Sequence, residues 1–177
     1  MIDEISALQN VFLLLGSNLG DRLQILRSAE MLIEERIGEI QSASSVYETA
    51  PWGVLEQPAF LNQILIVSTG LLPEEVLRIV LEIEHELGRV RYERWGARVI
   101  DIDMLYYQDL VLDSARLTLP HPRLHERRFT LVPLNEIASG FIHPVFQKTT
   151  SQLLTECSDP GAVVNISTNN TNSDFSN

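Results

Sequence analysis

The stretch that decides the fold of this chain is GRVRYERWGARVIDID, residues 88–103. It places four arginines directly before a strand-like segment that carries two carboxylates, namely Arg89, Arg91, Arg94 and Arg98 before Asp101 and Asp103. Arginine binds phosphate oxygens with two parallel hydrogen bonds, and paired Asp oxygens suit Mg²⁺, which completes its shell with waters and substrate phosphates. The combination indicates a nucleoside triphosphate that binds together with magnesium.

The residues after the arginines predict a β-strand over 99–107. Because side chains alternate along a strand, Asp101 and Asp103 share one face, and the apolar residues between and after them form the other face, which suits packing on helices. Two buried like charges are unfavourable without a cation. An exposed edge strand with solvated carboxylates would be the better explanation of an Asp-x-Asp pair alone. The neighbouring arginines favour metal–phosphate chemistry instead.

Hydrophobic periodicity predicts alternating strands and helices on either side of this stretch. Val11–Leu15 is the apolar run of a buried strand. Asp21 is the expected N-cap of an amphipathic helix over 21–37. The remaining expected elements are strands at 42–48 and 60–69, a helix from 73 to a stop at Gly88, a turn at 109–114 and a helix near 131–138.

The charge of the chain is unevenly distributed. Its 177 residues carry a net charge of −11, which would normally disfavour polyanionic ligands. Residues 1–88 contain four arginines and fourteen acids, whereas residues 89–128 contain eight arginines and six acids. Positive charge is therefore local and almost all arginine, because Lys148 is the only lysine. A nucleic-acid surface would be broader and net basic, so we expect no nucleic-acid partner.

The length predicts a single domain over 1–166, followed by a disordered polar tail over 167–177. No apolar run is long enough to span a membrane, and the acidic start does not resemble a leader peptide, so we expect a cytoplasmic protein. Cys157, the only cysteine, can form neither an internal disulfide nor a structural zinc site. We expect a monomer.

Two further features are open to more than one interpretation. The loop GSNLG at 16–20 could cradle an anion at a helix start, but a tight strand-to-helix turn requires the same residue types. Asn62 near the start of a strand could be satisfied by water, or it could recognise the edge of a heterocycle with its donor and acceptor.

Four blocks of sequence, in this order, resemble the 6-hydroxymethyl-7,8-dihydropterin pyrophosphokinase family. They are LGSNLG at 15–20, QPAFLN at 57–62, GRVR with ERWG and DID between 88 and 103, and LPHPR at 119–123. The resemblance covers roughly residues 11–145. It implies an α+β fold with a ferredoxin-like core, an antiparallel sheet flanked by helices, which agrees with the expected order of strand, helix, two strands, helix and strand.

The resemblance also implies an activity. A member of this family is an ATP-dependent diphosphotransferase of folate biosynthesis: it transfers the β,γ-diphosphate of ATP to the hydroxymethyl group of 6-hydroxymethyl-7,8-dihydropterin and releases AMP. Asp101 and Asp103 would hold two Mg²⁺ ions, with Arg89 and Arg98 as further catalytic residues. No general base is assigned. The residues that resemble the ATP site of the family are Glu84, Arg89, Arg91, Trp95, Arg98, Arg116, Thr118, His121 and Arg127.

A second set of residues resembles the pterin site of the family. Phe60 and Phe129 would sandwich the flat ring, and Asn62 would read its amide edge. Thr49, Ala50 and Trp52 match loop positions that contact the pterin mainly through backbone groups. Some members have Tyr, Pro and a small aliphatic residue where this chain has Phe60, Ala50 and Trp52.

Two other functions are compatible with the same motifs. One is a nucleotide- or pterin-binding regulator without catalysis, and the other is a small-molecule kinase that transfers a single phosphate. The intact carboxylates and arginines favour the diphosphotransferase. We also expect the loop 89–97, with glycines near both ends, to close over the phosphates when the nucleotide binds.

Overall fold

The central feature of the fold is an antiparallel sheet with the strand order β5 (Asp101–Tyr107), β1 (Gln9–Ser17), β4 (Phe60–Thr69), β3 (Tyr47–Thr49) and β8 (Val163–Asn165), in which β2 (Glu39–Ala43) also pairs with β4. The computed structural model describes residues 7–51, 56–89 and 97–167. In chain order the described elements are β1 (Gln9–Ser17), α1 (Arg22–Arg36), β2 (Glu39–Ala43), β3 (Tyr47–Thr49), β4 (Phe60–Thr69), α2 (Pro73–Glu86), β5 (Asp101–Tyr107), β6 (Leu112–Asp113), β7 (Thr118–Leu119), a 3₁₀ turn at Leu124–Glu126, α3 (Arg128–Ala138), α4 (Thr150–Glu156) and β8 (Val163–Asn165).

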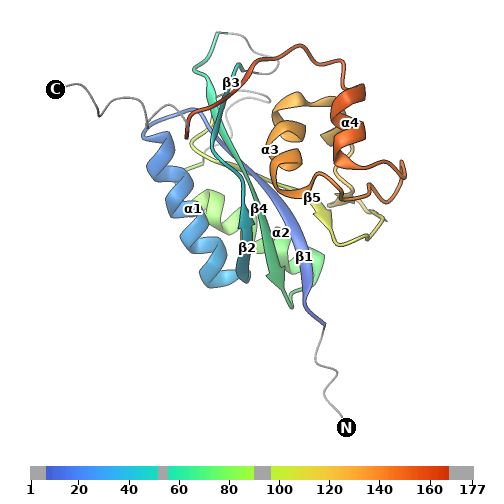
Figure 1. The fold of residues 1–177 in the computed structure, drawn as a ribbon. Coiled ribbons are helices and arrows are strands. Elements are labelled where there is room, and N and C mark those ends of the chain that lie inside the picture. Colours follow the sequence, from blue (N-terminus) through green and yellow to red (C-terminus); the bar gives the residue numbers. More distant parts are fainter. Residues whose placement is uncertain (1–6, 52–55, 90–96, 168–177) are drawn as a thin grey trace, which may run out of the picture.

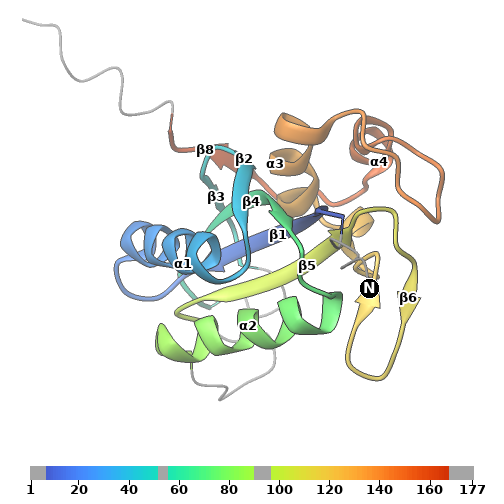
Figure 2. The same ribbon diagram turned by 90° about the horizontal axis from the view of Figure 1, so that it is seen from below.

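The connectivity confirms the ferredoxin-like α+β core. The first strand β1 lies between β4 and β5 and runs antiparallel to both. The helices α1 and α2 each connect strands that lie on either side of an intervening strand, and both pack on the same face of the sheet (Figures 1 and 2). In the described part of the chain, no helix is long and apolar enough to cross a membrane.

The two faces of the sheet support separate hydrophobic cores. One core joins α1 and α2 to the face of the sheet that carries Leu13, Leu65 and Ile102. The other joins α3 and α4 to the opposite face, where Phe12, Leu14 and Ile64 lie. Alternation along each strand produces this division, and the views in Figures 1 and 2 show the helices on both sides.

The strand that carries the two carboxylates has an irregularity farther along. Phe12 of β1 pairs with Tyr106, whereas Leu13 pairs with Met104, so Leu105 is an extra residue in β5. Such a bulge lets two successive side chains lie on one face, and Leu105 and Tyr106 both belong to the core under α3 and α4. Asp101 and Asp103 precede the bulge and share their face with Leu105.

The structure corrects several boundaries of the predicted elements. The prediction of a single strand over 42–48 was wrong, because this segment divides between β2 and β3. The ladder is interrupted at Ser44, whose hydroxyl accepts from the backbone N–H of Ile64 at 2.9 Å in place of a backbone carbonyl. Part of the expected turn at 109–114 pairs as β6 with β7. The helix α4 and the edge strand β8 were not predicted. The helix at 21–37 is confirmed as α1, with Asp21 accepting from the N–H of Gln24.

Candidate active site at one end of the sheet

Two pockets meet at one end of the sheet within the described part of the chain. Both are lined by Arg98, Asp101 and Asp103. The first, here called the aromatic pocket, also includes Leu14, Gly16, Thr49, Ala50, Phe60, Asn62, Arg127 and Phe129. The second, here called the arginine pocket, also includes Glu84, Arg89, Arg116, Thr118, His121 and Pro122. The carboxylates of β5 thus form the boundary between the aromatic pocket and the arginine pocket.

Asp101 is held by arginine on both of its oxygens. Its Oδ1 accepts from Arg89 at 2.7 Å and its Oδ2 accepts from Arg98 at 2.6 Å. Such short charge-assisted bonds are stronger than neutral hydrogen bonds. The two guanidinium groups are mostly buried, so they form fixed positive charges beside the carboxylates.

Asp103 lies on the same face of β5 as Asp101, two residues farther along the strand. Burial raises the pKa of its carboxyl group, and the negative charge of Asp101 acts in the same direction, while Arg127 and Arg98 oppose the shift. Two carboxylates from one strand therefore face a region where additional positive charge is favourable. Hard divalent cations such as Mg²⁺ need only one or two protein carboxylates when substrate phosphates complete the shell, and the donor set of this site fits such an ion.

The end of α2 positions Arg89. Gly88 adopts a left-handed backbone conformation with φ of 95°, and the N–H of Arg89 donates to the carbonyl of Glu84 at 3.0 Å. This helix termination brings the Arg89 guanidinium against the Glu84 carboxylate as well as against Asp101. Glu84 is 3% exposed, and it also accepts from the backbone N–H of Ile102 at 2.8 Å, so it supports β5 between the two aspartates.

His121 also lines the arginine pocket. Its backbone N–H donates to Leu105 of β5 at 2.9 Å, and its Nδ1 accepts from the N–H of Arg123. Burial lowers the pKa of His121 to about 4, and the positive charge of Arg127 adds to the effect. The imidazole is therefore neutral at physiological pH, which leaves the arginines as the cations of this pocket.

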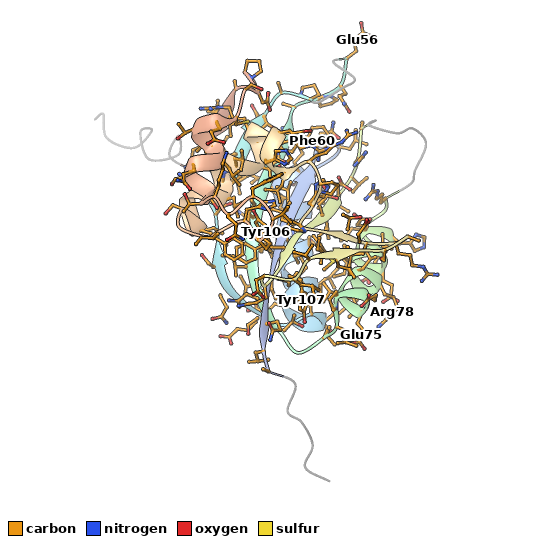
Figure 3. All side chains as sticks on the ribbon, turned by 90° about the vertical axis from the view of Figure 1, so that its right-hand side faces the viewer. Glu56, Phe60, Glu75, Arg78, Tyr106 and Tyr107 are labelled. Atoms are coloured by element: carbon orange, nitrogen blue, oxygen red, sulfur yellow. The ribbon has the colours of Figure 1, made fainter. Side chains whose placement is uncertain are left out.

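The aromatic pocket combines aromatic and polar groups. Phe60 begins β4 and Phe129 lies in the first turn of α3, while Asn62 is 4% exposed. Figure 3 shows Phe60 at the end of the sheet that is far from Glu75 and Arg78 of α2. The Arg127 guanidinium lies 5.7 Å from the centre of the Phe129 ring. A flat heterocycle with a polar rim matches this lining.

The comparisons with known proteins agree with this geometry. The profile of the 7,8-dihydro-6-hydroxymethylpterin-pyrophosphokinase (HPPK) family matches residues 12–139. This chain belongs to the HPPK family. The 2-amino-4-hydroxy-6-hydroxymethyldihydropteridine pyrophosphokinase of Aquifex aeolicus is 44% identical over 138 residues, which are 78% of this chain and 86% of that protein. The Bacillus subtilis enzyme of the same name is 42% identical over 127 residues, which are 71% of this chain and 76% of that protein.

Longer relatives contain a similar segment. The folic acid synthesis protein FOL1 of Dictyostelium discoideum is 43% identical over 157 residues, which are 88% of this chain and 24% of that protein. A solved structure of HPPK-DHPS in complex with substrates has a TM-score of 0.72 at 15% identity, over 85% of this chain and 43% of that one. The chain thus spans about a quarter of FOL1 and less than half of this HPPK-DHPS chain, and the structural likeness supports the fold of the HPPK segment.

The structure brings most of the residues predicted from the resemblance into the two pockets. The expected pterin residues Thr49, Ala50, Phe60, Asn62 and Phe129 line the aromatic pocket. The expected ATP residues Glu84, Arg89, Arg98, Arg116, Thr118 and His121 line the arginine pocket. Arg127 was expected with the nucleotide but lines the aromatic pocket. Trp52, Arg91 and Trp95 lie outside the described residues, as does most of the expected closing loop.

Asn18 is not among the residues that line the two pockets, but it supports segments that do, and the sequence did not reveal this role. Its backbone N–H donates to the Arg98 carbonyl, and its Oδ1 accepts from the Arg98 N–H at 2.6 Å. Its Nδ2 donates to Gln57 and to the Pro58 carbonyl, both at 3.1 Å. Asn18 therefore links the segment before Phe60 to the segment that carries Arg98. The segment 16–20 forms the turn from β1 to α1, which was one of its two interpretations, and the anion site stays a prediction.

Proposed function

We propose that this chain transfers the β,γ-diphosphate of ATP to the hydroxymethyl oxygen of 6-hydroxymethyl-7,8-dihydropterin and releases AMP, as a diphosphotransferase of folate biosynthesis. The family uses ATP as co-substrate. The observation that carries the proposal is the shared boundary of the two pockets: Arg98, Asp101 and Asp103 belong to both. A ring in one pocket and a triphosphate in the other would meet at these residues.

The aromatic pocket would hold the pterin. Phe60 and Phe129 offer apolar ring faces, and Asn62 offers a polar group to the rim of the heterocycle. Binding there would direct the hydroxymethyl substituent towards Asp101 and Asp103. Holding both reactants in one orientation supplies a large part of the rate enhancement in reactions of this class.

The arginine pocket would hold the nucleotide. Arg89, Arg98 and Arg116 can pair with phosphate oxygens. Asp101 and Asp103 would hold magnesium, two ions in our proposal, which would neutralise the phosphates and polarise the β-phosphorus. Arg98 lies on the boundary and would contact the charge that develops on the transferred group.

The transfer step is a substitution at the β-phosphorus. The bond between the hydroxymethyl oxygen and the β-phosphorus forms, and the bond from that phosphorus to the oxygen that bridges the α- and β-phosphates breaks. AMP leaves with the bridging oxygen, and the hydroxyl proton passes to solvent or to a phosphate oxygen. The protein contributes mainly position and charge, since phosphoryl transfer requires little covalent participation from side chains.

The product identifies the reaction. Purified protein with ATP, Mg²⁺ and 6-hydroxymethyl-7,8-dihydropterin should produce AMP at a rate that depends on the pterin. ADP as the product would indicate a single-phosphate kinase, and the absence of pterin-dependent turnover would contradict the proposal. Asp101→Asn and Asp103→Asn should each lower kcat by about a hundredfold or more, since charge stabilisation at the transferred group is lost. A binding protein without catalysis would not show this loss.

We further propose that the protein acts in the cytoplasm as a monomer, without a nucleic-acid partner. The net charge of −11 supports the last point, because a like-signed field opposes contact with nucleic acid outside the local arginine cluster. Size-exclusion chromatography with light scattering, with and without ligands, tests the oligomeric state.

A further inference from the structure

Gly16 is the one glycine among the described residues that line the aromatic pocket. It is on β1, and it pairs with Asn62 of β4 on one side and with Asp101 of β5 on the other. It therefore lies between the polar group proposed to read the ring and the carboxylate proposed to hold the metal. Gly16 also lines the pocket itself.

Glycine at position 16 leaves space that a side chain would fill. The positive-φ glycines of the described residues are Gly20 and Gly88, so Gly16 is not needed for an unusual backbone conformation. A Cβ atom added at Gly16 would lie 3.0 Å from Oδ1 of Asn62 and 3.7 Å from Cδ1 of Phe60. Glycine weakens a strand and often marks close approach of a ligand. A methyl group here would push the Asn62 amide or occupy the space beside the Phe60 ring.

The orientation of the Asn62 amide is fixed from the other side. Its Nδ2 donates to the Thr49 hydroxyl at 2.6 Å, and both residues are only 4% exposed. The amide nitrogen is thereby directed at β3, while Oδ1 is the atom nearest to the open side of Gly16. The group presented to a ligand over Gly16 is an acceptor, which requires an N–H donor on the ring.

We propose that Gly16 and Thr49 determine which ring the aromatic pocket accepts. Because Gly16 has no side chain, the space beside Asn62 is open and the edge of a flat heterocycle can approach. Thr49 is a positioning residue that keeps the Asn62 acceptor directed at a ring N–H. This inference rests on the proposed function and deepens it, because it assigns the discrimination between heterocycles to Gly16 and Thr49, which contact the Asn62 amide.

Binding measurements test the proposal without turnover. The probe is 6-hydroxymethylpterin, titrated calorimetrically into protein saturated with Mg²⁺ and a non-hydrolysable ATP analogue. Gly16→Ala should weaken binding of the probe by about tenfold or more, as expected for an added methyl group in a filled site. The affinity for the nucleotide analogue alone should stay within about threefold, because that ligand contacts the other pocket. Gly140→Ala is the matched control, since an added Cβ there meets no atom within 4 Å.

Substitutions of Thr49 provide a second test that does not depend on the stability of the glycine variant. Thr49→Val keeps the shape but removes the acceptor for Asn62, and it should weaken binding of the probe by about tenfold. Thr49→Ser keeps the hydroxyl and should restore binding. The 3-methyl derivative of the probe lacks the N–H of the amide edge. Wild-type protein should bind this derivative less tightly than the probe. In Thr49→Val the difference between the two affinities should be smaller, because the Asn62 amide can then turn.

The outcomes separate this inference from the proposed function. Wild-type protein that binds nucleotide but not the probe would refute the proposed function and the inference with it. Probe binding in wild-type protein with unchanged affinity in a folded Gly16→Ala or in Thr49→Val would refute the inference alone. Equal losses of probe and nucleotide binding would also refute it, because they would indicate a general structural role.

Discussion

Arg98 holds one oxygen of Asp101 in a charge-assisted hydrogen bond of 2.6 Å. Arg89 holds the other oxygen at 2.7 Å. A cation that binds Asp101 must therefore compete with two guanidinium groups, whereas nucleotide phosphates would offer those groups alternative partners. Metal and nucleotide binding should be coupled through this carboxylate.

The first prediction concerns that competition. Arg98→Gln should raise the affinity for Mn²⁺ alone by about three- to tenfold, the size of effect expected when a competing charge-assisted bond is removed. The same substitution should lower the affinity for the nucleotide. Electron paramagnetic resonance of free Mn²⁺ measures the first effect, and Arg78→Gln, which removes an exposed pair with Glu82, is the control. Unchanged or weaker Mn²⁺ binding in Arg98→Gln would contradict the coupling.

The second prediction concerns Asn18, which is 1% exposed and joins both sides of the site. Asn18→Ala removes the acceptor for the Arg98 N–H and the donor to the Pro58 carbonyl. Loss of these buried bonds should lower the free energy of unfolding by about 1–3 kcal/mol. The larger effect should be on kcat, because Arg98 and the segment before Phe60 lose a common support.

Denaturant titration and steady-state kinetics at full ligand saturation measure the two effects of Asn18→Ala. Gln57→Ala is the comparison, because it removes one partner of Asn18 and leaves the bonds to Arg98. A variant that loses stability but keeps the kcat of wild-type protein would show that Asn18 serves the fold alone.

The sequence predicted the parts of the site that depend on local pattern. Alternation along the strand placed Asp101 and Asp103 on one face, and both line the same two pockets. The pairing of Asn18 with Arg98 joins residues 80 positions apart, so no local pattern could reveal it. Arg127 lies beside Phe129 because α3 begins between them, and the resemblance alone did not indicate which pocket that start would face.

The same contrast holds for the fold. Helix α2 has a clear apolar stripe that periodicity detects, and α1 has a narrower one made of Leu26, Ala29 and Ile33. Both stripes belong to one core. The break between β2 and β3 depends on the side chain of Ser44. Its hydroxyl, in place of a backbone carbonyl, accepts the hydrogen bond from the N–H of Ile64. The strand β8 is three residues long, and its pairing with β3 is a tertiary contact. Short elements of this kind carry too little periodic signal to be predicted.

The third prediction compares two buried tyrosines. The Tyr47 hydroxyl donates to Glu136 at 2.5 Å, whereas the Tyr106 hydroxyl has no hydrogen-bond partner among the described residues. Tyr47→Phe should lower the free energy of unfolding by about 1–2 kcal/mol, because the carboxylate loses a donor. Tyr106→Phe should leave that free energy unchanged or raise it by up to about 1 kcal/mol.

The two phenylalanine variants serve as controls for each other, since each loses one hydroxyl. Urea unfolding at neutral pH measures both. Destabilisation by Tyr106→Phe as large as that by Tyr47→Phe would show that the Tyr106 hydroxyl is satisfied after all, for example by an ordered water.

The last prediction concerns stability at mildly acidic pH. His143 is 3% exposed, and its Nδ1 accepts from the N–H groups of Val145 and Phe146. Burial lowers the pKa of His143 to about 4, and nearby His125 contributes in the same direction. The unfolded chain binds this proton near pH 6.5, so the contribution of His143 is complete above that pH and is lost as the pH falls towards 4. The loss should be about 2 kcal/mol after allowance for solvent screening.

His143→Asn keeps an acceptor for both N–H groups but cannot titrate, so its stability should fall less than that of wild-type protein between pH 7 and pH 4.5 in urea titrations. Parallel pH dependence of the two proteins would assign the acid sensitivity to other groups.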